Sequence, residues 1–135
     1  MELPVKRNVL VIEDDTFIRE LISLSLRDAG HRVIDIAEQA LRRLPRAADI
    51  QVIVVNLNAP RAAAHGIVTD LRARFPRADI IAISGYFPAR TPAQGPLAAT
   101  LGVQRTLAKP FKCDALVALV GDLAQRHAAC AVQAR

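Results

Sequence analysis

The feature that most constrains this chain is a regular alternation between short apolar runs and segments of helical periodicity. The apolar runs cover residues 8–12, 32–37, 50–55, 80–83 and 105–108. The run at 50–55 is almost unbroken, which is typical of a central strand buried on both faces. Helices are expected at 16–29, 38–44, 66–75, 97–101 and 113–124. Strands that alternate with helices predict an α/β fold with a parallel sheet and helices on both faces.

The composition fits one globular domain without a membrane span. Of the 135 residues, 52% are hydrophobic and 23% are charged, and no apolar run approaches the roughly 18 residues that a span requires. The first residues lack the features of a signal peptide. We therefore expect a cytoplasmic protein in which Cys113 and Cys130 remain thiols. The expected domain covers residues 1–124, and residues 125–135 form the end of the last helix and a tail.

The net charge of +5 raises an alternative of another class, an arginine-rich module that binds nucleic acid. The arginines include Arg42, Arg43, Arg46, Arg61, Arg72, Arg74, Arg77, Arg90 and Arg105. They are scattered, without a dense run or interleaved aromatic residues. This distribution is more typical of solvated helix faces than of a nucleic-acid surface.

Polar and charged side chains follow four of the apolar runs at the point where each run ends. They are Glu13 and Asp14 after the first run, Asn56 after the third, Ser84 after the fourth and Lys109 after the fifth. Ligands bind at the carboxyl ends of the strands in an open parallel sheet, where these residues should meet. Carboxylate oxygens suit a divalent cation, and hydroxyl and ammonium donors suit a phosphoryl group. Each residue alone has an ordinary explanation, but their joint arrival at one edge favours a binding site.

Five motifs match one known family over about residues 7–124. They are "VLVIEDDTFIRE", "NLNAP", Gly66, "IAISG" and "LAKPF". On these motifs the chain resembles a response-regulator receiver domain, the module of two-component signalling. The resemblance implies a flavodoxin-like, doubly wound sheet of five parallel strands in the order 2-1-3-4-5.

The resemblance also implies a magnesium site. Glu13 and Asp14 match the acidic pair that holds Mg²⁺, and the backbone carbonyl of Asn58 matches a third ligand. Asp15 lies one position beyond the acidic pair and is expected to cap the following helix. The family further implies a cis peptide bond between Lys109 and Pro110, which turns the chain after the fifth strand.

Asn56 is the main departure from the family pattern, because it lies where receivers carry the phosphoacceptor aspartate. By resemblance, Ser84 hydrogen-bonds the phosphoryl group and Lys109 forms an ion pair with it. A neutral carboxamide is a far poorer nucleophile than a carboxylate, so no phosphorylation at Asn56 is expected. The site also loses one formal charge, which predicts weak Mg²⁺ binding at most.

Other positions depart from the family in the same direction. Thr106 lies where receivers carry the switch aromatic, whose rotation reports phosphorylation. Ala59 and His65 replace the usual methionine and acid, and a histidine at that point is expected in an exposed loop. Residues 86–96 contain three prolines, which predicts an irregular loop before a short helix.

Two receiver functions are therefore open. The favoured one is a single-domain receiver that acts through protein–protein contacts and is not phosphorylated. The alternative is a phosphotransfer-competent receiver, represented by an engineered variant in which Asn56 replaces a native aspartate. The retained site residues favour it: Glu13, Asp14, Ser84 and Lys109. An enzyme is not expected, because no phosphate-binding glycine loop follows the first strand.

The expected partners are a sensor histidine kinase or a downstream signalling protein, and a homodimer is possible. In receivers the partner surface is commonly the face formed by the fourth helix, the fifth strand and the last helix. Here that face carries Leu97, Leu101, Thr106, Val117 and Gly121. A proline-rich flank would make such a surface rigid and lower the ordering cost of binding. The same residues are also compatible with a core position.

Overall fold

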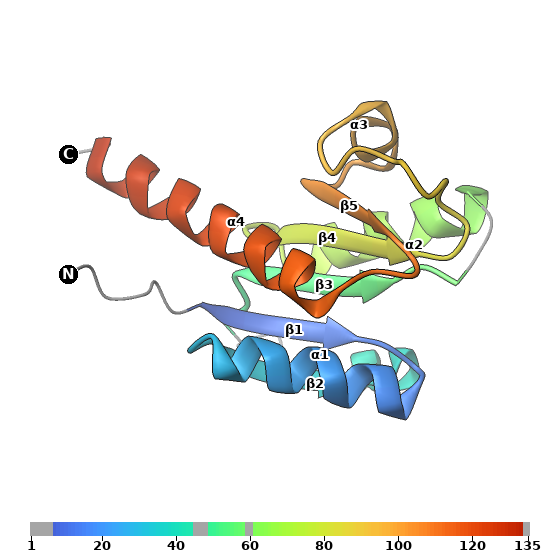
Figure 1. Cartoon of the computed structure of the whole chain (residues 1–135), viewed down its shortest axis with the longest axis horizontal. Coiled ribbons are helices and arrows are strands. Elements are labelled where there is room, and N and C mark those ends of the chain that lie inside the picture. Colours follow the sequence, from blue (N-terminus) through green and yellow to red (C-terminus); the bar gives the residue numbers. More distant parts are fainter. Residues whose placement is uncertain (1–6, 45–48, 59–60, 134–135) are drawn as a thin grey trace.

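The computed structural model describes residues 7–44, 49–58 and 61–133, and its centre is a five-stranded sheet (Figure 1). The strands are β1 (Asn8–Ile12), β2 (Arg32–Ile36), β3 (Val52–Asn56), β4 (Asp79–Ser84) and β5 (Arg105–Ala108). Their order across the sheet is β2-β1-β3-β4-β5, and each neighbouring pair is parallel. The predicted fold class and strand order are confirmed.

The connecting helices are α1 (Thr16–Asp28), the 3₁₀ helix η1 (Glu38–Arg43), α2 (Arg61–Arg74), α3 (Pro96–Leu101) and α4 (Cys113–Gln133). Asp15 caps α1 as predicted, because its Oδ1 accepts a hydrogen bond from the Ile18 amide at 3.0 Å. The short helix α3 begins with a proline, whose missing N–H costs nothing at that position. It ends at Leu101 and is capped by Gly102, whose φ of 77° suits a glycine.

Helices cover both faces of the sheet (Figure 1). The helices α1 and α4 pack on one face over Val9 and Val11 of β1, and α2 and α3 pack on the other over Leu10 and Ile12. Successive strand residues point to opposite faces, so each strand supplies both cores. All four apolar residues of β3 are buried, which explains the unbroken apolar run in the sequence.

A second polar cluster lies at the amino end of β1, away from the carboxyl ends of the strands. The Arg7 amide donates to Nδ1 of His31 at 3.1 Å, and the Arg7 guanidinium donates to the Ala124 carbonyl of α4 at 2.8 Å. Burial lowers the pKa of His31, and the positive charge of Arg7 lowers it further. A neutral His31 can accept the Arg7 bond, whereas a protonated imidazole cannot.

Several element boundaries differ from the predicted ones. Helix α2 begins at Arg61 and not at residue 66, so His65 is an exposed helical residue and not part of a loop. The "RAAA" sequence at the start of α2 has high helix propensity, but it lacks the apolar periodicity from which a helix is predicted. Helix α4 extends to Gln133 through an alanine-rich segment, so the end of the last helix lies within residues 125–135. Strand β3 covers 52–56 and not 50–55, which makes Asn56 its last residue.

Within the described part of the chain, none of the helices combines the length and apolar character needed to cross a membrane. Ala59 and Arg46, which the sequence analysis considered, lie outside the described residues.

Candidate functional site

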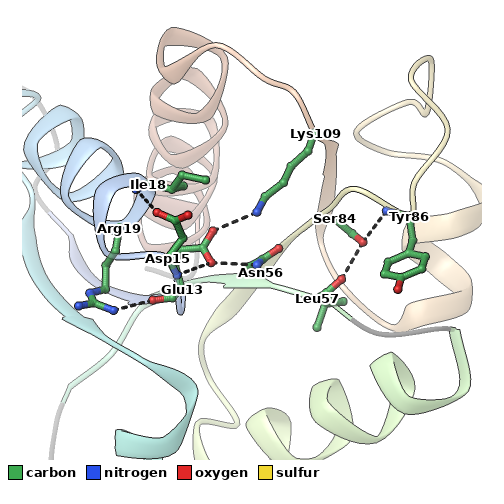
Figure 2. A network of polar contacts seen from close by, with 9 residues as sticks. All are labelled: Glu13, Asp15, Ile18, Arg19, Asn56, Leu57, Ser84, Tyr86 and Lys109. Atoms are coloured by element: carbon green, nitrogen blue, oxygen red, sulfur yellow. Dashed lines mark hydrogen bonds and ion pairs between the residues drawn. The ribbon is translucent and has the colours of Figure 1, made fainter.

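The carboxyl ends of four strands bring the predicted site residues to one edge of the sheet (Figure 2). Asn56 and Ser84 are the last residues of β3 and β4, and Glu13 and Lys109 directly follow β1 and β5. The strand register pairs Asn56 with Ile83 and Ser84 with Ala108, so these strand ends are level with one another. These side chains therefore lie together at the carboxyl ends of the strands, as expected from the sequence.

Glu13 is the centre of the site. Its side chain is 2% exposed, and its Oε1 forms an ion pair with Nζ of Lys109 at 3.1 Å. Its Oε2 accepts hydrogen bonds from Nδ2 of Asn56 at 2.9 Å and from the Asp15 amide at 3.3 Å. A buried carboxylate is tolerated only when it is paired and hydrogen-bonded, and Glu13 meets both conditions within the chain.

Asn56 thus acts as a hydrogen-bond donor where an aspartate would be a second acceptor. Its Nδ2 group faces the Glu13 carboxylate, and its Oδ1 is buried without a hydrogen-bond partner among the described residues. A bond from a neutral donor to a carboxylate is charge-assisted and stronger than one between neutral groups. The carboxamide therefore stabilises the buried charge of Glu13.

Ser84 is engaged by the backbone on both sides of the site. Its hydroxyl donates to the Leu57 carbonyl at 2.7 Å and accepts from the Tyr86 amide at 3.0 Å (Figure 2). The side chain is 1% exposed. Because a serine hydroxyl has one hydrogen to donate, Ser84 would have to release Leu57 before donating to a phosphoryl oxygen.

Lys109 reaches across the strand ends from the segment that follows β5. Its peptide bond to Pro110 is cis, as the family resemblance implied. Its backbone amide donates to the Ser84 carbonyl at 3.0 Å, which joins the ends of β4 and β5. The ammonium group is directed to Glu13 and not to Asn56.

The carboxylates that the family resemblance assigns to Mg²⁺ already have hydrogen-bond or ion-pair partners in the chain. Both oxygens of Glu13 already accept hydrogen bonds, and one of them contacts the Lys109 ammonium. Asp14 is exposed, and its Oδ1 accepts a hydrogen bond from the Glu38 amide at 2.8 Å. Among the described residues, no group of three acidic, histidine or cysteine side chains is placed to hold a metal ion. Asn58 follows β3 with an exposed side chain.

Thr106 does not lie on the surface. Its side chain is 1% exposed, and its Oγ1 donates to the Pro92 carbonyl at 3.0 Å. Leu101 is 2% exposed and belongs to the core beneath α3, and Leu97 packs against the same core. The predicted partner surface is therefore wrong for Leu101 and Thr106. Both side chains are buried because α3 covers the sheet beside β5 and encloses the residues between them.

Helix α1 carries an exposed apolar stripe that was not predicted from the sequence pattern. Phe17, Leu21 and Leu24 are 70%, 42% and 64% exposed, and they follow one another at helical spacing. A largely apolar groove of about 370 Å³ adjoins Leu21 and is lined by Ile18, Leu21, Ile22, Lys109, Pro110, Phe111 and Cys113. Helix α1 has a second stripe, Ile18, Ile22 and Leu26, which faces the core. The core stripe alone explains a helix at this point of the sequence, so the outer stripe was not singled out.

Comparison with known proteins gives a consistent result. The family model described as "Response regulator receiver domain" matches residues 9–121. The response regulator protein FleR of Pseudomonas aeruginosa is 32% identical over 122 residues, which are 89% of this chain and 24% of FleR. This chain thus spans about a quarter of the length of that relative.

Two solved structures illustrate the likeness in fold. The receiver domain of the Francisella response regulator 1452 superposes with a TM-score of 0.73 and 22% identity, covering 90% of this chain and 98% of that one. A chain of the crystal structure of histidine kinase ThkA in complex with response regulator protein TrrA superposes with a TM-score of 0.66 and 21% identity. It covers 87% of this chain and 97% of that one.

Proposed function

Because this chain belongs to the response regulator receiver domain family, we propose that it is a receiver that works through protein–protein contacts without accepting a phosphoryl group. Receiver domains serve two-component signal transduction and are signalling modules rather than typical enzymes.

The observation that carries the proposal is the hydrogen bond from Asn56 to Glu13. Phosphoryl transfer to a receiver needs an anionic oxygen in line with the phosphorus atom. Asn56 offers a neutral amide whose nitrogen is held by Glu13 at 2.9 Å. The Lys109 ammonium forms an ion pair with Glu13, and the Ser84 hydroxyl donates its hydrogen to the Leu57 carbonyl. The two groups that would assist a phosphoryl group, Lys109 and Ser84, therefore already have partners within the chain.

Weak Mg²⁺ binding belongs to the same proposal. Receivers typically bind Mg²⁺ at their acidic site, and the affinity depends on the charge and number of oxygen ligands. In this chain the ammonium of Lys109 lies 3.1 Å from Glu13, so a dication near Glu13 would be repelled until the lysine moved. Asp14 would also have to leave the Glu38 amide in order to turn its Oδ1 toward a metal ion.

For partner contact, the structure favours the stripe of Phe17, Leu21 and Leu24 on α1. A contiguous exposed apolar patch is a common sign of an interaction site, and the groove beside Leu21 could receive a side chain of the partner. Receiver domains interact with histidine kinases, so a kinase helix is the first candidate partner. A homodimer through α3, β5 and α4 is less favoured because Leu101 and Thr106 are buried.

The proposal is tested by incubating the protein with acetyl phosphate and Mg²⁺ and measuring the intact mass. The expected result is no stable addition of a phosphoryl group, whereas Asn56→Asp restores an acceptor and should be labelled. Labelling of the unmodified chain mapped to residue 56 would contradict the proposal. Absence of labelling in a folded Asn56→Asp variant would show that Ser84 and Lys109 no longer support the chemistry either.

The contact surface is tested separately with Leu24→Asp, matched by Tyr86→Ala, which alters a 66% exposed side chain outside α1. Binding to purified candidate kinases and the oligomeric state by sedimentation are the measurements. Leu24→Asp should weaken kinase binding at least tenfold and leave circular dichroism unchanged, and Tyr86→Ala should have no effect. An equal change in kinase affinity in both variants would show that α1 is not the contact surface.

A further inference from the structure

The segment that joins β4 to α3 is attached to the outer edge of the sheet by Thr106. The Thr106 amide donates to the Ala93 carbonyl at 2.9 Å, and Oγ1 of the same residue donates to the Pro92 carbonyl at 3.0 Å. The strand order makes β5 an edge strand, and edge strands leave backbone donors and acceptors open to other chains. The segment 92–94 thus covers part of the β5 edge, as an additional strand would.

Arg105, the residue before Thr106, holds the same segment from the other face of the sheet. It is 3% exposed, and the side-chain amide of Gln94 lies against its guanidinium; with the amide assigned so that its oxygen faces Arg105, the oxygen accepts from Nε at 3.1 Å. Its Nη2 lies 3.5 Å from the Asp122 carboxylate on α4, and its Nη1 donates to the Gln104 carbonyl at 2.8 Å. Arg105 therefore joins the segment 92–94 to both β5 and α4.

The rest of the β4–α3 segment is also well anchored. The Tyr86 amide donates to Oγ of Ser84, and Phe87 packs against the core. Thr91 closes a local turn, because its amide and its Oγ1 both donate to the Pro88 carbonyl, at 3.0 and 2.7 Å. At the far end, a Cβ atom on Gly95 would lie only 3.3 Å from Cβ of Pro92, so a larger residue would require Pro92 to shift.

We propose that Arg105 and Thr106 form a clamp that seals the edge of β5 with residues 92–94 and holds the β4–α3 segment in one conformation. The position at which receivers carry a mobile aromatic is here a fixed anchor. A partner that approaches this side meets a closed edge and a rigid proline-containing segment. The clamp contacts do not include Asn56, Glu13 or Lys109, so the inference goes beyond the proposed function and can fail independently of it.

The clamp is tested by amide hydrogen exchange on the full chain with Thr106→Val. This change keeps the shape and the β-branch of the side chain and removes only the bond to Pro92. The net strength of one hydrogen bond predicts a roughly three- to tenfold faster exchange of the Thr106 amide, which donates to the Ala93 carbonyl. Amides of β1 should keep their rates, because opening of the segment is local.

Thr91→Val is the matched control, since it removes a hydroxyl–carbonyl bond of 2.7 Å within the same segment but no bond to β5. It should change exchange only near residues 88–91. Thr106→Ser keeps the hydroxyl and should behave like the unmodified chain. Unchanged exchange at residue 106 in Thr106→Val, or the same change in Thr91→Val, would overturn the clamp.

If Thr106→Val does not fold, Gln94→Ala tests the clamp from the exposed side of the segment, where truncation leaves the core intact. It should accelerate exchange of the Thr106 amide, which donates to the Ala93 carbonyl, while the melting transition stays cooperative. Exchange equal to that of the unmodified chain would then refute the proposal.

Discussion

Replacing Asn56 by aspartate should destabilise the protein in the absence of a metal ion. The change removes the bond from Nδ2 to Glu13, a bond to a charged group that contributes about 1.5–3 kcal/mol. It also places a second carboxylate beside Glu13, and two like charges at about 4 Å repel by about 4 kcal/mol at an effective dielectric constant of 20. The Lys109 ammonium, 3.1 Å from Glu13, offsets much of this repulsion. We expect a net loss of about 2–4 kcal/mol in the free energy of unfolding.

Urea denaturation in a chelating buffer measures this loss. With a slope of about 2 kcal/mol per M, the midpoint should fall by roughly 1–2 M. Asn56→Ala is the control, because it removes the hydrogen bond without adding a charge. Its urea midpoint should fall by less than that of Asn56→Asp. Mg²⁺ should raise the midpoint of Asn56→Asp and leave the other two proteins nearly unchanged. A midpoint for Asn56→Asp equal to that of Asn56→Ala, with no response to Mg²⁺, would refute the electrostatic argument.

Three further predictions concern other contacts. The folded state lowers the pKa of His31, so the unfolded chain takes up a proton at a higher pH than the folded chain does. The contribution of His31 to the free energy of unfolding should therefore be full above about pH 6.5 and should fall as the pH drops below that value. His31→Asn, which keeps a hydrogen-bond acceptor, should flatten this pH dependence in urea titrations. Lys109→Met leaves the Glu13 charge uncompensated and should cost about 3 kcal/mol, part of which Glu13→Gln in the same chain should restore. Gly95→Ala should lower the melting temperature, whereas Gly85→Ala, whose Cβ meets no atom within 4 Å, should not.

The strands and the placement of the site were predictable because both depend on local patterns. An apolar run that ends in a polar residue marks the carboxyl end of a parallel strand, and Glu13, Asn56, Ser84 and Lys109 all follow this pattern. The partners within the site were not predictable, since the sequence does not tell whether Lys109 turns to Glu13 or to Asn56. That choice depends on distances between strands that lie far apart in the chain.

The structure differs most from the prediction where the role of a residue does not follow from its residue type. Thr106 looks like a lost switch residue, and only the fold shows its bonds to Pro92 and Ala93. The outer stripe of α1 was hidden for a related reason, because Phe17 and Leu24 belong to a helix whose core stripe already accounts for its apolar residues. Periodicity finds the face that a helix buries, but it does not find a second face that the helix leaves exposed.

The charges around Glu13 indicate why an amide suits position 56 in this chain. An aspartate there would add a third carboxylate to Glu13 and Asp14, and one lysine cannot neutralise three acids, so a divalent cation would be needed to hold them together. With Asn56, the Lys109 ammonium balances Glu13, and Asp14 is exposed and bonded to the Glu38 amide. We infer that Asn56 converts a site whose charges need a metal ion into one whose buried Glu13 charge is balanced within the chain, although Oδ1 of Asn56 has no hydrogen-bond partner among the described residues. On this reasoning, the retained Lys109 is explained by its pairing with Glu13, and its presence does not require a phosphoryl group.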